Sequence, residues 1–180
     1  MKQPIENYIP QDLTTHFHKQ ARKVWFVSMF VVFAWTFVIL LAPIAKANNF
    51  ENISAPLYKF FGFICHQMDS RSFHIENHPF AVCARCFGVY FGLFLGFVIY
   101  PLLRKIDEIE PLPRFWLFLA MIPIGIDWTL GIFGIWENTH LSRFLTGLIL
   151  GTACAVFIVP ALVEIFQLWP GKKMNLTQRR

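Results

Sequence analysis

The chain has 180 residues, of which 56% are hydrophobic and 15% are charged, and phenylalanine alone contributes 21. A soluble domain of this size would expose too much of that apolar surface to water, so the composition excludes an ordinary soluble protein. The formal net charge is +5. No basic patch interleaved with aromatic residues accompanies it, which argues against binding to nucleic acid.

Four apolar segments are long enough to cross a bilayer, which requires about 20 helical residues. We expect transmembrane helices at residues 24–45, 83–103, 115–136 and 144–167. Between them we expect a cytoplasmic N-terminal segment (1–23), a long outer loop (46–82), a cytoplasmic turn (104–114), an outer turn (137–143) and a cytoplasmic tail (168–180). The sequence thus predicts an all-α polytopic membrane protein with a single membrane domain over residues 1–180.

The distribution of lysine and arginine predicts the orientation of these helices. Eleven of the 16 basic residues lie in segments 1–23, 104–114 and 168–180, and segments rich in them stay in the cytoplasm. We therefore expect both termini in the cytoplasm, in a bacterial inner membrane, with the positive charge against anionic lipid. Ala45-Lys46-Ala47 resembles a signal-peptide cleavage site. The apolar stretch before it exceeds the usual core of about 7–15 residues, so a retained helix is predicted.

The outer loop contains a short apolar run at residues 57–64. Ser54 is expected to cap this helix, with Pro56 in its first turn. The run is too short to span a membrane, so it is predicted to be an interfacial or re-entrant helix.

Soft metal ligands follow that run. Cys65 and His66 lie at its end, and Cys83-Ala-Arg-Cys86 opens the second membrane helix. Zinc takes four Cys or His ligands in tetrahedral geometry, and a helix N-terminus stabilises thiolates. We therefore predict a Zn²⁺ site with the ligands Cys65, His66, Cys83 and Cys86. Neighbouring residues rarely both reach one metal, so His74 or His78 is the alternative fourth ligand.

Thiol–disulfide exchange is the rival chemistry for the cysteines. A membrane oxidoreductase with an outer CxxC pair needs a second cysteine pair to pass electrons along. Cys65 is the one other cysteine in the outer segments, since Cys154 is expected near mid-membrane. The odd number favours a metal, and a structural disulfide between Cys65 and the CxxC pair is a third reading.

These motifs carry a resemblance. Cys65-His66-Gln67, Arg71-Ser72-Phe73 and the run at 82–92 resemble the pattern of a bacterial membrane-protein family catalogued as domain of unknown function 2085. Members are also similar in a later Asp, Arg and Gly, here Asp127, Arg143 and Gly147. The resemblance implies a polytopic membrane protein but no particular activity.

Charged residues in the outer half of the membrane extend the candidate site. Asp127 lies within the third predicted helix, where a carboxylate needs a partner. Arg143, Arg85 and Arg71 are the candidates, and a structural ion pair is the alternative to a role at the site. Arginine binds phosphate and carboxylate through paired hydrogen bonds, so we predict these arginines and His140 as substrate-binding residues.

Two classes of function follow. In the first, the protein is a metal-dependent enzyme acting on a lipid or lipid-linked anionic substrate, with Asp127, His66 and Arg143 as catalytic residues. In the second, a metal or disulfide fixes the outer loop of a non-catalytic lipid-binding, transport or scaffold protein. A closed four-ligand metal site favours the second, and three ligands with an open position favour the first.

Glycines recur every four residues in the second helix (Gly88, Gly92, Gly96) and in the fourth (Gly147, Gly151). Small residues at this spacing let membrane helices approach closely. We expect these faces to pack within the chain, with a homo-oligomer through the same faces as the alternative.

Overall fold

The computed structural model describes residues 11–106, 108, 110, 112–135 and 137–168, with only the backbone for residues 11–16, 167 and 168. The helices in these ranges are α1 (Gln11–Ala47), α2 (Glu51–Gly62), α3 (Ala84–Leu103), α4 (Phe115–Ile132) and α5 (His140–Leu168). Between α2 and α3 lie a 3₁₀ turn, η1 (Asp69–Arg71), and an antiparallel hairpin of β1 (His74–Ile75) and β2 (His78–Pro79).

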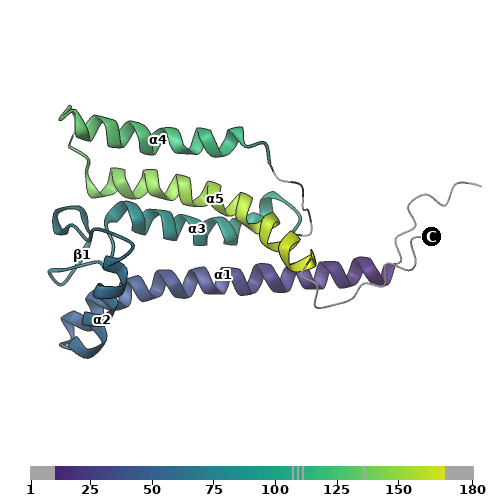
Figure 1. The fold of residues 1–180 in the computed structure, drawn as a ribbon, viewed down its shortest axis with the longest axis horizontal. Helices are drawn as coiled ribbons and strands as arrows, with labels where there is room; N and C mark the ends of the chain where they lie inside the picture. The colour runs from purple at the N-terminus through teal and green to yellow at the C-terminus, as the bar shows by residue number, and fades with distance from the viewer. Residues whose placement is uncertain (1–10, 107, 109, 111, 136, 169–180) are drawn as a thin grey trace, which may run out of the picture.

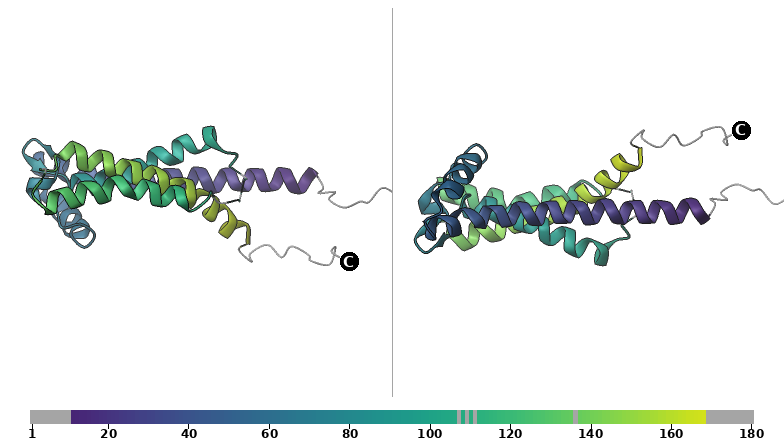
Figure 2. Two further views of the ribbon diagram at one scale, coloured as in Figure 1. Left: turned by 90° about the horizontal axis from the view of Figure 1, so that it is seen from above. Right: turned by 90° about the horizontal axis from the view of Figure 1, so that it is seen from below.

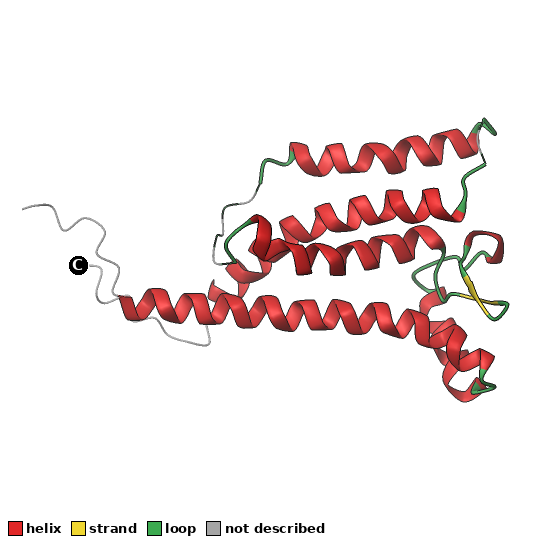
Figure 3. Ribbon diagram, turned by 180° about the vertical axis from the view of Figure 1, so that it is seen from behind, coloured by secondary structure: helices red, strands yellow, loops and turns green. Residues whose placement is uncertain are grey.

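Helices α1, α3, α4 and α5 are long and apolar enough to cross a membrane. They run side by side, and α2, η1 and the hairpin gather at one end of the bundle (Figures 1 and 3). We call this the cysteine end, because Cys65, Cys83 and Cys86 lie there. Helix α1 extends beyond the bundle at the opposite end (Figure 2). The predicted all-α membrane fold, with four spans and one short extra helix, is confirmed.

The helix ends differ from the predicted boundaries for local reasons. Helix α1 begins at Gln11 rather than at residue 24, so the polar stretch before the span continues the same helix. Helix α4 stops short of Gly134, whose φ of +65° is incompatible with a helix. Helix α5 begins right after Thr139, because the Thr139 hydroxyl accepts a hydrogen bond from the Ser142 N–H at 3.1 Å and caps the helix.

Helix α2 starts directly where α1 ends. Asn49 has a φ of +60°, the Phe50 N–H bonds to the Ala45 carbonyl at 2.8 Å, and the Asn49 N–H bonds to the Lys46 carbonyl at 3.1 Å. These two bonds form a Schellman motif, which ends a helix on a left-handed residue. Phe50 is then the N-cap of α2. The predicted cap at Ser54 is wrong, because Ser54 lies buried within the helix.

Large apolar side chains on α2 and just after it stay uncovered. Phe60 is 48% exposed and Phe63 is 83% exposed. A short helix with such a face suits the boundary between lipid and water.

Helices α3 and α5 pack with their backbones in contact. A Cβ added at Gly88 or Gly92 would collide with the α5 backbone, and one added at Gly147 or Gly151 would collide with the α3 backbone. The Thr152 hydroxyl donates a hydrogen bond to the Gly92 carbonyl at 3.1 Å across this contact. Glycines on both helices therefore let them approach each other, as membrane helices with small-residue stripes do.

This packing decides between the two predicted uses of the glycine faces. Both faces are filled by the partner helix within the chain. The close glycine contact that the structure describes is therefore one between two helices of the same chain.

The hairpin was not predicted. Its two-residue turn, Glu76-Asn77, has φ values of +47° and +65°, the conformation of a type I′ turn. Asparagine favours this conformation but glutamate does not, so only one of the two turn residues indicates a type I′ turn. The hairpin is closed by a bond from the Phe80 N–H to the Phe73 carbonyl at 2.7 Å.

Replacing Gly151 with leucine should force α3 and α5 apart, because its Cβ would meet the Val89 and Leu93 backbone. Overpacking of this kind costs about 1–3 kcal/mol or more. We expect a lower melting temperature and aggregation in size-exclusion chromatography. The matched control is Gly125→Leu in α4, since a Cβ at Gly125 meets nothing within 4 Å. Equal melting temperatures for the two variants would contradict this packing.

The fold also gives a test of orientation. The hairpin turn lies at the cysteine end, and the described basic residues Arg22, Lys23, Arg104 and Lys105 lie toward the other ends of α1 and α3 (Figure 1). An epitope inserted between Glu76 and Asn77 should bind antibody on intact spheroplasts, because charge bias keeps the basic segments inside. An epitope after the last residue should bind only after permeabilisation. The reverse pattern would overturn the predicted orientation.

Candidate metal centre and the adjoining arginine cavity

Two separate segments bring three cysteines together. Cys65 follows the end of α2, Cys83 is the N-cap of α3, and Cys86 lies in the first turn of α3. Their three Sγ atoms lie within 4.8 Å of one another. The Cys83 N–H also donates a hydrogen bond to Cys65 Sγ at 3.2 Å. All three are free thiols, as is Cys154 in α5, which does not belong to this group.

The Gln67 side chain holds the two segments in register. Gln67 has a φ of +46°, which turns the chain back on itself just after Cys65. Its Nε2 donates hydrogen bonds to the carbonyls of Tyr58, in α2, and Ala81, just before α3, at 2.7 Å and 2.8 Å. Gln67 of the Cys-His-Gln motif thus ties α2 to the segment just before α3, and we call this pair of hydrogen bonds the Gln67 clasp. This role of Gln67 was not predicted from the sequence. The position of a long amide side chain directly after two candidate ligands could have indicated it.

A second bond reinforces this clasp. The Tyr58 hydroxyl donates to the Pro79 carbonyl, and burial raises the pKa of Tyr58 to about 12. The phenol therefore stays protonated and remains a donor at all physiological pH values.

The cysteines sit on an apolar floor and face an open cavity. Ile39, Phe61 and Val82 are fully buried beneath Cys65, which is itself 6% exposed. Above it, a cavity of about 290 Å³ is lined by the three cysteines, His66 and Arg71, among others. Hydrogen bonds from the thiols of Cys83 and then Cys86 lower the pKa of the Cys65 thiol, which favours the thiolate that metals bind.

The three cysteines are close enough together to hold a metal ion. Thiolates about 2.3 Å from a tetrahedral zinc lie about 3.8 Å from one another, so the present spacing requires little contraction. A backbone N–H bonded to a ligating sulfur is the kind of outer contact that orients metal ligands.

The structure does not bring a histidine into this group. None of the three histidines predicted as fourth ligand joins the cysteines among the described residues. His66 is exposed but lines the same cavity. His74 pairs with Asp69 at 3.1 Å, and His78 lies half-buried in β2. The described arrangement is thus three thiols with one open side.

A second cavity adjoins the first. It has a volume of about 680 Å³ and is lined by Arg71, Arg85 and Arg143, together with Glu137 and Asn138. Arg71 also lines the cysteine cavity. Arg71 is therefore shared by the cavity of the thiols and the cavity rich in arginine.

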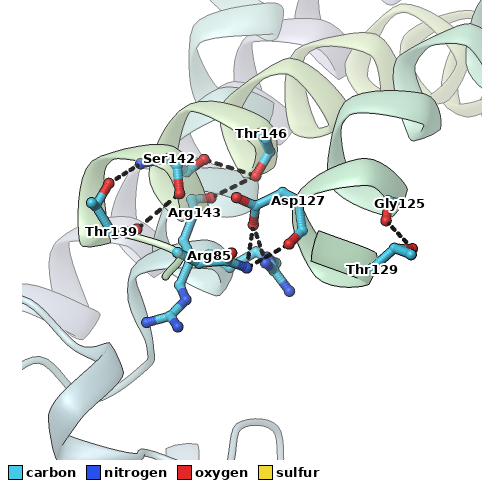
Figure 4. Close-up of polar contacts among 9 residues, drawn as sticks. Arg85, Gly125, Asp127, Thr129, Thr139, Ser142, Arg143 and Thr146 are labelled. Atoms are coloured by element: carbon cyan, nitrogen blue, oxygen red, sulfur yellow. Dashed lines mark hydrogen bonds and ion pairs between the residues drawn. The ribbon is translucent and has the colours of Figure 1, made fainter. Parts of the chain in front are cut away.

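The partner of Asp127 is Arg85. Asp127 is 8% exposed, and its carboxylate accepts an ion-paired hydrogen bond from Arg85 (Figure 4). Asn138 Nδ2 donates to the Asp127 carbonyl at 2.6 Å and to its carboxylate at 3.2 Å. Arg143 directs its guanidinium away from this pair (Figure 4). The pair joins α4 to α3.

Arg71 is positioned by the two residues after it. Ser72 is fully buried, and its hydroxyl donates to the Met68 carbonyl at 2.9 Å. Phe73 packs against Phe80, Phe87 and Phe144. The Arg-Ser-Phe motif thus anchors η1 and holds Arg71 at the cavity wall.

His140, which was predicted as a substrate-binding residue, lies at the start of α5 beside Phe73. Its ring packs on Phe73 with centroids 5.8 Å apart, and it does not line the arginine cavity. By packing on Phe73, His140 helps to hold the segment that positions Arg71.

The comparisons with known proteins agree with the membrane fold. The profile of a family described as "Predicted membrane protein (DUF2085)" matches residues 65–157, a range that starts at Cys65. An uncharacterised protein of Methanocaldococcus jannaschii is 40% identical over 132 residues, covering 71% of this chain and 85% of the relative. An uncharacterised protein of Methanothermobacter thermautotrophicus is 36% identical over 96 residues, covering 53% of this chain and 85% of the relative. No solved structure matches.

Asp127→Ala should destabilise the protein, because it leaves the Arg85 charge without its partner in a largely buried place. Breaking one side of such a pair costs about 3–5 kcal/mol, and the exposed fifth of Arg85 places the expected loss near the lower bound. The double variant Arg85→Met/Asp127→Leu should recover most of the melting temperature, since it removes both charges. The single variants Arg85→Met and Asp127→Leu are measured beside the double variant. If the double variant loses as much stability as the two single variants together, the ion pair does not stabilise the protein.

Proposed function

We propose that this chain, which belongs to the DUF2085 family of predicted membrane proteins, is a membrane metalloprotein that binds zinc through Cys65, Cys83 and Cys86 on the extracytoplasmic side. The observation that carries the proposal is the meeting of three thiols, from two segments, within 4.8 Å. The Gln67 clasp fixes this meeting from both sides.

The open side of the cluster favours an enzyme over a structural staple. Catalytic zinc sites keep three protein ligands and one open position, whereas structural sites are closed. A metal there would polarise an oxygen or lower the pKa of a bound water. The adjoining cavity, with Arg71 as the shared wall, suits the anionic group of a lipid or lipid-linked substrate.

The proposed roles of the other residues follow from their places. His66 lines the cysteine cavity and is the proton carrier closest to the thiols along the chain. Arg71 and Arg143 bind the anionic group, and Arg85 helps them. Asp127 acts through Arg85, which it holds in place.

Thiol–disulfide exchange is the second candidate, favoured by three free thiols beside an open cavity. In that role one thiolate attacks a substrate disulfide. A second cysteine then displaces the mixed disulfide, so two substrate thiols form as one protein disulfide forms.

Metal analysis with thiol titration separates the two candidates. The purified protein should contain about one zinc per chain, and chelating the zinc should make three further thiols reactive toward a thiol reagent. Cys65→Ser, Cys83→Ser and Cys86→Ser should each lose the zinc, because a two-thiolate site binds it far more weakly. Cys154→Ser is the matched control and should keep it, since Cys154 lies outside the group.

Two other results would contradict the proposed zinc site. A protein without metal, with two of the three cysteines oxidised, would reject the metal site and support the exchange reaction. Zinc that survives all three substitutions would place it elsewhere in the chain.

A further inference from the structure

A third cavity lies along the same helices as the arginine cavity. It has a volume of about 1150 Å³, and its walls are mostly apolar side chains of α3, α4 and α5, with Thr152 of α5 and with Arg104 and Leu112 from the segment between α3 and α4. They include Trp116 and Pro123 of α4 and Ala153 and Phe157 of α5. This cavity lies in the half of the bundle away from the cysteine end.

One face of α4 runs past both cavities. Trp116, Ala120, Pro123, Asp127 and Gly131 recur at intervals of three or four residues, which places them on one side of the helix. The first three line the apolar cavity, and Gly131 lines the arginine cavity. Between Trp116 and Gly131 every member of this face is small or is Asp127, which is paired with Arg85. This face thus carries no large apolar side chain between Trp116 and Gly131, while Asn138 packs on Gly131 and the paired Asp127 lies between the parts of α4 that line the two cavities.

The length of this face is informative. From Trp116 to Gly131 the helix rises about 22 Å, whereas one leaflet of a bilayer core is about 15 Å thick. An apolar chain whose head lies at the cysteine end would reach past the middle of the membrane.

The charged residues at the cysteine end indicate which polar head group a bound lipid would carry there. Neither Arg71 nor Arg143 forms an ion pair within the described ranges, and the buried Arg85 Nε has no hydrogen-bond partner there. Among the residues that the structure describes, Glu137 is the one acidic side chain that lines the cavity with the three arginines. Arg71, Arg143 and the free Arg85 Nε together offer more donors than the two oxygens of a carboxylate can accept, and a phosphate monoester has three acceptor oxygens.

We propose that the substrate is a single-chain lipid phosphate taken from the bilayer, with its phosphate on Arg71, Arg85 and Arg143 and its apolar chain along α4 in the cavity of α3, α4 and α5. This inference rests on the proposed function for the reaction, but the binding itself does not require the metal. The shared Arg71 wall then places the phosphate beside the thiol cluster.

The test is equilibrium binding to the purified full-length protein in detergent, with three probes. Farnesyl phosphate carries both parts of the ligand, farnesol lacks the phosphate, and inorganic phosphate lacks the chain. We expect farnesyl phosphate to bind about 100-fold tighter than either fragment. Similar affinity for farnesyl phosphate and inorganic phosphate would show that a free phosphate is the ligand. Similar affinity for farnesyl phosphate and farnesol would show that the arginines bind no phosphate. Either result overturns the proposal.

Variants separate the two parts of the site. Ala153→Phe fills the apolar cavity and should weaken farnesyl phosphate about tenfold without changing inorganic phosphate. Arg143→Gln should weaken both phosphates about tenfold. Ile158→Phe, on the exposed side of α5, is the matched control and should change neither. Ala120→Leu replaces Ala153→Phe if that variant is not monodisperse. Unchanged farnesyl phosphate binding in the cavity variant contradicts the proposal.

Zinc content, measured on each sample, keeps this test apart from that of the proposed function. If a protein without zinc binds farnesyl phosphate selectively, the proposed metal site is rejected and the proposed lipid-phosphate site is supported. A zinc protein that does not distinguish the three probes would remove the lipid-phosphate site alone.

Discussion

The backbone contact between α3 and α5 is the constraint on which the rest of the molecule depends. Four glycines let the backbones of the two helices meet directly, so their separation is fixed mainly by backbone atoms rather than by adaptable side chains. The first turn of α3 carries Cys86 and Arg85, and the first turn of α5 carries Arg143. The contact therefore sets the distance between the thiol cluster and the arginine cavity.

The loop between α2 and α3 completes what the helices begin. Gln67 joins the end of α2 to the start of α3, and the buried Ser72 and Phe73 fix Arg71 between the two cavities. Helix α4 is attached less tightly, through the ion pair of Asp127 and Arg85 and the bonds of Asn138. That looser attachment leaves the space in which we place an apolar chain.

Much of the fold follows from the sequence because its signals are local. Apolar length predicts the four spans, and the glycine spacing predicts the close pair of helices. The ends of α1 and α2 depend on a left-handed Asn49, and the hairpin depends on a left-handed Glu76; neither conformation follows from residue type alone. The glycine spacing alone also does not distinguish packing within one chain from packing between two copies, because both need the same stripe of small residues.

The candidate site shows the same division. The three cysteines were predicted as a group, and the structure brings them together because the CxxC spacing and the helix start are local features. The fourth ligand was not predictable, since the positions of His66, His74 and His78 depend on a turn at Gln67 and on the hairpin. The partner of Asp127 was one of three arginines in the sequence, and the packing of α4 selects Arg85.

X-ray absorption spectroscopy at the zinc edge of the purified protein tests the central claim most directly. Three thiolates with an open position predict three sulfur scatterers at about 2.3 Å and one lighter oxygen or nitrogen scatterer near 2.0 Å. A shell of oxygen and nitrogen without sulfur would contradict the assignment of the metal to Cys65, Cys83 and Cys86.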